Sequence, residues 1–444
     1  MNPSPLQLRE HALAIWSAGV DAVRPDRLMA DAIGRFPESW RTTIAKAPRI
    51  LVVGCGKAGG PMAAGLEAAL PDALNRIHGV VNVPSGETRS TWHVRLHGAR
   101  PAGSNHPTAA GVEGSEEMLH LLGSAGPDDV AICLISGGGS ALMPAPADGI
   151  SLLDKQLVTK LLHSCGATIQ EMNAVRKHLS RVKGGRLAEA FRGKLLVSLI
   201  ISDVVGDPLD VIASGPTAAD PTTFADALAV LHRFRLTPSL PTAVVQLLER
   251  GRRGEIFDTP KELPAYVHNL VIGNNATALT VSARTAAELG YRVLNLGPFI
   301  EGESREVGVV SAGLVRGIRE NGLPISAPAC ILIGGETTVA LGEKPGQGGR
   351  NQEFVLAAMR ALGREHLPGV AVLSGGTDGE DGPTDAAGAV ATIETWEQCE
   401  SQGLDAAGFL ARHDSYPYFD RTGGLIRTGL TGTNVTDVRV ILVR

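Results

Sequence analysis

Short, unbroken runs of Val, Ile and Leu recur along this chain, and Ala- and Leu-rich stretches separate them. The clearest runs span 50–53, 79–83, 130–135, 195–201, 267–272, 292–296, 330–333, 370–373 and 438–443. A strand with one face in solvent alternates apolar and polar residues, whereas a strand that is apolar throughout is buried on both faces. The pattern therefore predicts an α/β fold with mostly parallel or mixed sheets, covered on both faces by helices in α/β/α three-layer domains.

The length of the chain indicates more than one such domain, because 444 residues exceed the usual domain size of about 100–200 residues. The segment 233–265 is rich in Pro and charge and contains no strand pattern. We therefore expect a Rossmann-like N-terminal domain over 1–240 and a C-terminal α/β domain over 241–444. The stretch 6–30 is predicted to be an amphipathic helix. Gly273-Asn274-Asn275 is predicted to precede a helix that closes at Gly290.

The composition excludes several classes of partner. The net charge is −5, aromatic residues make up 4% of the chain, and no basic stripe is visible, so no nucleic-acid partner is expected. No apolar run approaches the ~18 residues that a membrane-spanning helix needs. The five Cys residues form no C-x-x-C pair, which indicates reduced thiols and no structural zinc. We expect a cytoplasmic protein with no membrane partner.

The first apolar run leads into Gly54-Cys55-Gly56-Lys57-Ala58-Gly59, a glycine spacing found in dinucleotide-binding turns. A nicotinamide site also needs an acidic residue at the end of the next strand to hold the ribose, and here the first acid, Glu87, comes beyond that strand's turn. Lys57 is also unusual where backbone must approach a pyrophosphate. Three interpretations stay open: a nicotinamide site, a strand-to-helix turn without a ligand, and a phosphate or carboxylate site that uses Lys57.

A second glycine-rich loop follows the run 130–135. It consists of Ser136, Gly137, Gly138, Gly139 and Ser140. Three consecutive glycines are costly in conformational entropy, so they indicate either a flexible turn or a loop whose N–H groups wrap an anion. We predict that these five residues bind the phosphates of a nucleotide such as ATP.

Basic side chains cluster in the segment 173–188, which contains Arg176, Lys177, His178, Arg181, Lys183 and Arg186. Such a cluster is either a solvated helix face or a clamp for phosphates or for a substrate carboxylate. We predict Arg176 and Lys177 as substrate-binding residues. His106, between Asn105 and Pro107, is a further candidate, with a structural role as the alternative.

Acidic residues follow two of the apolar runs. Asp203, Asp207 and Asp210 come after 195–201, where side chains at the carboxyl end of a parallel strand face the ligand crevice. Asp203 is predicted to bind Mg²⁺ or to act as a general base, and a turn or capping role is the alternative. Asp378 follows 370–373, as do Asp381 and Asp385, and we predict it as a second metal ligand, with a structural turn equally open.

Arg350 stands in the sequence Gly-Gly-Arg-Asn-Gln-Glu at a predicted helix start. An arginine held there can stabilise charge on a transferring phosphoryl group. Together these strand ends predict a cleft between two α/β domains that holds a polyphosphate, Mg²⁺ and a small acid.

The same residues resemble a known family. The chain is similar to the class II glycerate 2-kinases, which join an N-terminal glycerate kinase domain to a C-terminal MOFRL domain, over about 10–440. The motifs that carry the resemblance are GCGKAGGPMA, ISGGGSALM, NAVRKHLSRVKGGRLA, SDVVGDPLDVIASGPT, GGETTV…GGRNQE and SGGTDGEDGPTDAAGA.

The resemblance implies transfer of the ATP γ-phosphate to the 2-hydroxyl of D-glycerate with Mg²⁺, giving 2-phosphoglycerate. It also implies that Lys57 and Arg350 are the active-site lysine and arginine of the family. Two other functions stay open: an NAD(P)H-dependent hydroxypyruvate reductase, a label that relatives often carry, and a non-catalytic sensor of sugar acids or nucleotides. The oligomeric state is open too, with a homodimer among the options.

Overall fold

The structure is a computed structural model that describes residues 4–101, 106–342 and 344–444, and its contacts divide the chain into two compact units. The middle unit is Pro25–Ile272, and the terminal unit joins Met1–Arg24 to Gly273–Arg444. These units do not coincide with the expected halves, 1–240 and 241–444. Residues 241–272 belong to the middle unit because their helix packs on the preceding helix and their strand extends the middle unit's sheet.

The sheet of the middle unit has the strand order β3-β2-β1-β4-β5-β6, and the pairs from β3 to β5 are parallel. The strands are β1 Ile50–Cys55, β2 Ile77–Pro84, β3 Val94–Arg100, β4 Val130–Ile135, β5 Leu195–Ile201 and β6 Val267–Gly273. Every residue of β1, β4 and β5 is buried, as their unbroken apolar sequences predict. The polar sequence of β3 carries no such signal, and the sequence analysis missed it.

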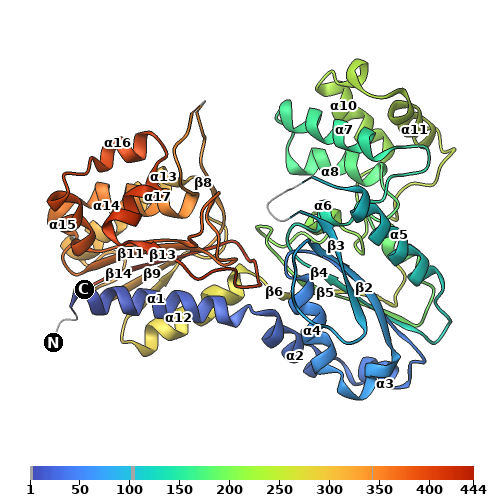
Figure 1. Cartoon of the computed structure of the whole chain (residues 1–444), viewed down its shortest axis with the longest axis horizontal. Coiled ribbons are helices and arrows are strands. Elements are labelled where there is room, and N and C mark those ends of the chain that lie inside the picture. Colours follow the sequence, from blue (N-terminus) through green and yellow to red (C-terminus); the bar gives the residue numbers. More distant parts are fainter. Residues whose placement is uncertain (1–3, 102–105, 343) are drawn as a thin grey trace. The chain divides into compact units, whose positions relative to one another are not determined.

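Helices cover both faces of this sheet. The helices of the middle unit are α2 Pro25–Gly34, α3 Glu38–Lys46, α4 Gly59–Ala69, α5 Ala109–Gly123, α6 Gly139–Leu142, α7 Leu152–Ser164, α8 Ile169–His178, α9 Arg186–Glu189, α10 Phe224–Arg233 and α11 Thr242–Arg252. Helix α4 approaches Val81 and Val83 of β2, whereas α5 approaches Asn82. Successive side chains of a strand point to opposite faces, so α4 and α5 lie on opposite sides. Helices α7, α8, α10 and α11 share a separate apolar core (Figure 1).

The terminal unit contains a mixed sheet in the order β13-β12-β11-β14-β9-β7, in which β7 and β9 are parallel and the other pairs are antiparallel. Its strands are β7 Arg292–Asn295, β9 Ala329–Ile333, β11 Val370–Gly376, β12 Gly388–Ala391, β13 Leu425–Ile426 and β14 Asp437–Val443, and a small separate sheet pairs β8 Gly302–Glu303 with β10 Thr337–Thr338. Each predicted apolar run of the chain thus overlaps a strand.

Helices also cover both faces of the mixed sheet. They are α1 Pro5–Ala22, α12 Asn275–Glu288, α13 Ser304–Asn321, α14 Arg350–His366, α15 Ile393–Ser401, α16 Ala406–Ala411 and α17 Ser415–Thr422. Figure 1 shows α1 and α12 on one face and α13 and α14 on the other. Among the described residues, no helix combines the length and the apolarity needed to cross a membrane.

The predicted helix over 6–30 is wrong, because α1 ends at Ala22 and α2 begins at Pro25. A proline has no N–H to continue a helix but fits the first turn of a new one. The predicted helix after Gly273 is confirmed as α12. Asn274 caps its first turn, and Gly290, with φ +86°, follows its C-cap.

Candidate active site

The strand order of the middle unit reverses direction at one place in its sheet, and this defines a topological switch point at the carboxyl ends of the strands. From β1 the chain moves outward to β2 and β3, and from β4 it moves the other way to β5 and β6. The neighbouring strands β1 and β4 therefore flank the topological switch point, where open α/β sheets bind their ligands. Lys57 follows β1 and Ser136 follows β4, so the two glycine-rich turns of the sequence meet there.

Hydrogen bonds join these two turns into one structure. The N–H of Lys57 donates to the carbonyl oxygen of Gly137 at 2.8 Å. The N–H of Ala58 donates to Oγ of Ser136 at 3.0 Å. The buried hydroxyl of Ser136 thus links the two turns, and Gly138, two residues further along the loop, has φ +76°.

Internal packing accounts for the glycine spacing of the first turn. A Cβ on Gly54 would lie 2.2 Å from the carbonyl oxygen of Leu134, and one on Gly56 would lie 2.0 Å from Oγ of Ser136. A Cβ on Gly59 would lie 2.8 Å from Cγ1 of Val81. The close approach of β4 and β2 thus requires these glycines, whether or not a dinucleotide binds.

The first turn of α4 already has a carboxylate beside it. A Cβ on Gly60 would lie 2.7 Å from Oε2 of Glu87. In dinucleotide-binding folds a pyrophosphate occupies this end of the helix. The position of Glu87 therefore disfavours a pyrophosphate there.

Two cationic side chains lie beside the second turn. A Cβ on Gly138 would lie 3.1 Å from Nη2 of Arg100 and 3.6 Å from Cγ of Lys57. The Lys57 side chain is exposed, whereas Arg100 is only 2% exposed. The sequence analysis missed Arg100, and the available signal was a basic residue directly before Pro101 at the end of an unrecognised strand.

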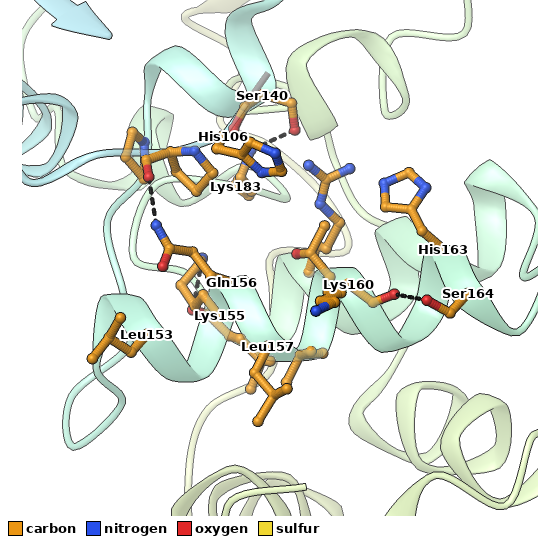
Figure 2. Close-up of a pocket in the computed structure, with 16 residues that line it drawn as sticks. His106, Ser140, Leu153, Lys155, Gln156, Leu157, Lys160, His163, Ser164 and Lys183 are labelled. Carbon is orange, nitrogen blue, oxygen red and sulfur yellow. Dashed lines mark hydrogen bonds between the residues drawn. The ribbon is translucent and has the colours of Figure 1, made fainter. Parts of the chain in front are cut away.

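A cavity of about 770 Å³ opens next to the same loop, since Ser140, the last residue of the loop, lines it. Figure 2 shows Lys155 and Lys160 of α7 across from His106, Ser140 and Lys183. The lining is completed by Pro107, Pro144, Leu153, Gln156, Leu157, Val158, Thr159, His163, Ser164, Arg176 and Leu179. These described lining residues include four Lys or Arg and no Asp or Glu, so the cavity favours an anion.

Hydrogen bonds fix two of the cavity's lysines. Nζ of Lys183 donates to Oγ of Ser140 at 2.8 Å and to its carbonyl oxygen at 2.9 Å. The Ser140 hydroxyl in turn lies 2.7 Å from Oγ of Ser214. Nζ of Lys155 donates to the carbonyl oxygen of Leu179 at 3.0 Å.

Burial and mutual repulsion lower the pKa of these cations. Burial, followed by repulsion from Arg176, lowers the pKa of Lys155 to about 7. Burial also lowers the pKa of Lys183 well below its ordinary value, and Arg176 and Lys155 add to the effect. An anion in the cavity would relieve this repulsion.

The structure separates the predicted substrate-binding residues. His106 and Arg176 line the cavity, but Lys177 does not. Nζ of Lys177 is buried and donates to Asp210 at 3.0 Å and to Asp220 at 3.1 Å. This ion pair ties α8 to the loop after β5 and gives Lys177 a structural task. Asp203, half-buried, follows β5 at the same edge of the sheet as Lys57.

The terminal unit holds the remaining predicted residues. Arg350 begins α14, and its guanidinium binds both oxygens of buried Asp437, with Nε–Oδ2 at 2.8 Å and Nη2–Oδ1 at 3.0 Å. Its Nη1 contacts Glu336 at 2.7 Å. Burial alone lowers the pKa of Arg350, but the Asp437 and Glu336 carboxylates raise it above its ordinary value. Asp378 follows β11, and its Oδ1 accepts from the N–H of Glu380 at 3.2 Å.

Asp381 anchors the start of α14. Its carboxylate accepts from the N–H groups of Asn351 at 3.0 Å and Gln352 at 2.9 Å. Burial raises the pKa of Asp381 to about 6, against the effect of these two N–H groups, and repulsion from Asp437 contributes. The arrangement fixes the direction in which Arg350 leaves the helix.

Comparisons with known proteins cover nearly the whole chain. A family model described as "Domain of unknown function (DUF4147)" matches residues 11–249, and one described as "MOFRL family" matches residues 329–437. A glycerate 2-kinase of Pyrococcus horikoshii is 40% identical over 442 residues, covering 99% of this chain and 98% of its own. A glycerate kinase of Danio rerio is 38% identical and covers 98% of both chains.

Two further comparisons concern the label and the fold. A putative hydroxypyruvate reductase of Agrobacterium vitis is 42% identical over 397 residues, covering 89% of this chain and 87% of its own. The crystal structure of a glycerate kinase from Thermotoga maritima matches this structure with a TM-score of 0.85 at 33% identity, over 99% of this chain and 100% of that one. The predicted α/β class with mostly parallel or mixed sheets is thereby confirmed.

Proposed function

Because the chain belongs to the DUF4147–MOFRL family of glycerate kinases, we propose that it transfers the γ-phosphoryl group of ATP to the 2-hydroxyl of D-glycerate. The observation that carries the proposal is the switch point of the middle unit. There the exposed Lys57 adjoins a glycine-rich loop, and that loop borders a cavity whose described lining residues include four cations and no acid. Both substrates of the reaction, ATP and D-glycerate, are anions. The loop with Lys57 and the cation-lined cavity lie along the same edge of the sheet.

The roles follow from the chemistry of each group. Lys57 and the loop Ser136–Ser140 bind phosphates of ATP. His106, Arg176 and Lys183 line the cavity, where Arg176 pairs with the glycerate carboxylate. Arg350 balances charge that develops on the γ-phosphoryl group, as the family resemblance implies. Phosphoryl transfer depends mainly on positioning and charge stabilisation, which these groups supply.

The reaction also requires a group that accepts the proton of the glycerate hydroxyl. The 2-hydroxyl oxygen of D-glycerate attacks the γ-phosphorus, and the bond from that phosphorus to the bridging oxygen of ADP breaks. The hydroxyl proton must pass to a base, and Asp203 at the end of β5 is the candidate.

Magnesium fits this site as a companion of the nucleotide. The described residues contain no group of three or more His, Cys, Asp or Glu that could form a closed metal cage. Mg²⁺ usually binds through one or two carboxylates together with substrate phosphates, so a single carboxylate suffices, and this is the alternative role of Asp203 to that of the base. The ion would neutralise phosphate charge. Asp378 is a weaker candidate, because a turn already uses its carboxylate.

The reductase label of some relatives makes a separate prediction. A hydroxypyruvate reductase must bind NADH or NADPH, and the turn after β1 is where this chain has the glycine spacing of such a site. Packing already accounts for the glycines there, and Glu87 lies against the first turn of α4. We therefore regard reductase activity as the less favoured alternative to kinase activity.

Product analysis on one sample divided in two tests both functions. One half receives D-glycerate and MgATP, and phosphorus NMR identifies the product. The other half receives hydroxypyruvate with NADH or NADPH. We expect 2-phosphoglycerate in the first half and no nicotinamide oxidation in the second. Nicotinamide oxidation without phosphoglycerate would reject the kinase proposal.

Lys57 provides the sharpest single-residue test. We expect Lys57→Ala to lower kcat by about 100-fold or more, because one preorganised charge contributes that much to a transition state. Lys194→Ala is the matched control, since the exposed Lys194 side chain pairs with the exposed Asp128 in the same unit. Near-normal kcat in Lys57→Ala would leave Lys57 with a structural role alone.

A further inference from the structure

One buried arginine near the switch point has guanidinium N–H groups that the fold leaves unsatisfied among the described residues. Arg100 ends β3 and is only 2% exposed. Its Nε and Nη2 have no hydrogen-bond partner within the described ranges, 4–101, 106–342 and 344–444. A buried cation without partners is strongly unfavourable, so native proteins normally pair such a group.

The surroundings of Arg100 indicate what the missing partner is. Its Nη2 lies beside Gly138 in the glycine-rich loop, with Lys57 on the same side: a Cβ added to Gly138 would lie 3.1 Å from Nη2 and 3.6 Å from Cγ of Lys57. Gly138 has φ +76°, and a side chain there would fill the space next to the guanidinium. The guanidinium of Arg100 and the side chain of Lys57 thus converge on a stretch of backbone without side chains.

We propose that Arg100 is a phosphate-binding residue, whose unpartnered N–H groups grip a phosphoryl group held against the loop Ser136–Ser140. The inference builds on the proposed kinase activity and adds a residue to it. A guanidinium presents its donors in a planar fork that matches two phosphate oxygens, whereas Lys57 supplies a point charge. The phosphoryl group belongs either to the nucleotide or to the phosphorylated product.

A comparison with another arginine separates this role from a structural one. Arg49 directly precedes β1, at the opposite edge of the same sheet, and its guanidinium binds buried Asp129 through Nε at 3.0 Å and Nη2 at 2.5 Å. Arg49 therefore already has its partner inside the chain. Replacing Arg49 by Met leaves the buried Asp129 carboxylate without a cation and with only the N–H of Gly126 among the hydrogen bonds described for it. Replacing Arg100 by Met instead removes a buried charge whose Nε and Nη2 are unsatisfied among the described residues.

The experiment uses the full chain and three variants: Arg100→Met, Arg100→Lys and Arg49→Met. Thermal unfolding without ligand gives Tm, and calorimetric titration gives Kd for ADP, 2-phosphoglycerate and D-glycerate. We expect Arg100→Met to have an unchanged or higher Tm. Its Kd for ADP or for 2-phosphoglycerate should rise by roughly tenfold to a hundredfold, the usual effect of losing a charged hydrogen bond. Arg100→Lys should lose less affinity, and D-glycerate should bind every variant alike.

The separate titrations with ADP and with 2-phosphoglycerate identify which ligand carries the phosphoryl group that Arg100 binds. A loss confined to ADP assigns Arg100 to the nucleotide, and a loss confined to 2-phosphoglycerate assigns it to the product. Arg49→Met should lower Tm while both Kd values stay unchanged. Unchanged Kd values in Arg100→Met, or a fall in Tm like that of Arg49→Met, would overturn the proposal.

The proposal and the kinase function can fail separately. A wild-type chain that makes phosphoglycerate while Arg100→Met binds both phosphate ligands normally rejects Arg100 alone. If the wild-type chain makes no phosphoglycerate, yet Arg100→Met binds ADP more weakly than wild type does, the kinase function is rejected and Arg100 is kept as a phosphate-binding residue.

Discussion

At the residue scale, buried charge is the feature that most distinguishes the cavity of the middle unit. Lys155 is buried and lines the cavity together with Arg176, and burial, followed by repulsion from Arg176, lowers its pKa from the ordinary 10.5 to about 7. Below about pH 7 the folded chain bears the cost of a buried ammonium group. As the pH rises from about 7 toward 10.5, the folded chain loses this proton while the unfolded chain keeps it. The stability contributed by this position therefore rises with pH.

Because the stability contributed by Lys155 rises with pH, the difference in free energy of unfolding between wild type and Lys155→Met should depend on pH. At pH 7 we expect the variant to gain roughly 1–3 kcal/mol in the free energy of unfolding, less the lost hydrogen bond to Leu179. The gain should shrink as the pH approaches 10.5. Urea unfolding between pH 6 and 10 measures it, with Lys160→Met, an exposed lysine of the same helix, as control. A difference that does not change with pH would contradict the shifted pKa.

Arg350 offers a second prediction at this scale, in the terminal unit. Fully buried Asp437 accepts from Arg350, Asn351 and Arg439, so it holds three donors in place. Asp437→Asn leaves two guanidinium groups facing each other. We expect a loss of about 3 kcal/mol in the free energy of unfolding, as for a buried pair that loses one partner.

The exposed pair of Asp385 with Arg427 is the matched control. Asp385→Asn should leave the stability almost unchanged, because solvent screens that pair. Equal effects of the two substitutions would mean that Asp437 does not organise the start of α14. If Arg350 acts in catalysis, Asp437→Asn should also lower kcat more than it raises KM.

At the scale of single elements, capping residues set where the helices of the middle unit begin. Helix α8, which carries Arg176 and Lys177, starts with a capping box in which Thr168 and Glu171 exchange hydrogen bonds. Thr168→Ala removes the acceptor for one N–H group of the first turn. We expect a loss of about 1 kcal/mol in the free energy of unfolding, measured with urea, while KM for D-glycerate stays unchanged. An altered KM would show that the start of α8 positions the substrate directly.

At the scale of the whole molecule, the chain's first helix belongs with the chain's last elements. Ile15 and Trp16 of α1 are buried in the terminal unit, and Nε1 of Trp16 donates to the carbonyl oxygen of Gly375 at 3.2 Å. The middle unit contains its own sheet and the helices that cover it. We therefore expect residues 25–272 to fold as an isolated fragment.

The terminal unit should behave differently when it is divided. Residues 273–444 alone would expose the sheet face that α1 covers. We expect no cooperative thermal transition by circular dichroism until a peptide of residues 1–24 is added, which should also shift Trp16 fluorescence to shorter wavelength. A cooperative transition without the peptide would show that α1 is dispensable for this fold.

The sequence by itself determined the α/β class and the strands that are apolar throughout, because burial on both faces removes the polar residues that alternation would require. It also located the two glycine-rich turns and Lys57, since few residues besides glycine tolerate such close backbone approach. It could not predict β3, whose polar sequence resembles a loop, or the end of α1 near Pro25, which an amphipathic pattern continues across.

Only the tertiary structure decided which charged residues have a task within the fold. Lys177 and Arg176 are neighbours on one helix, yet Lys177 is held by Asp210 and Asp220, while Arg176 lines a cavity with no acid among its described lining residues. The topology likewise brought Arg100 to Gly138, a residue far from it along the chain. Pairing depends on distance in space, and the sequence records only distance along the chain.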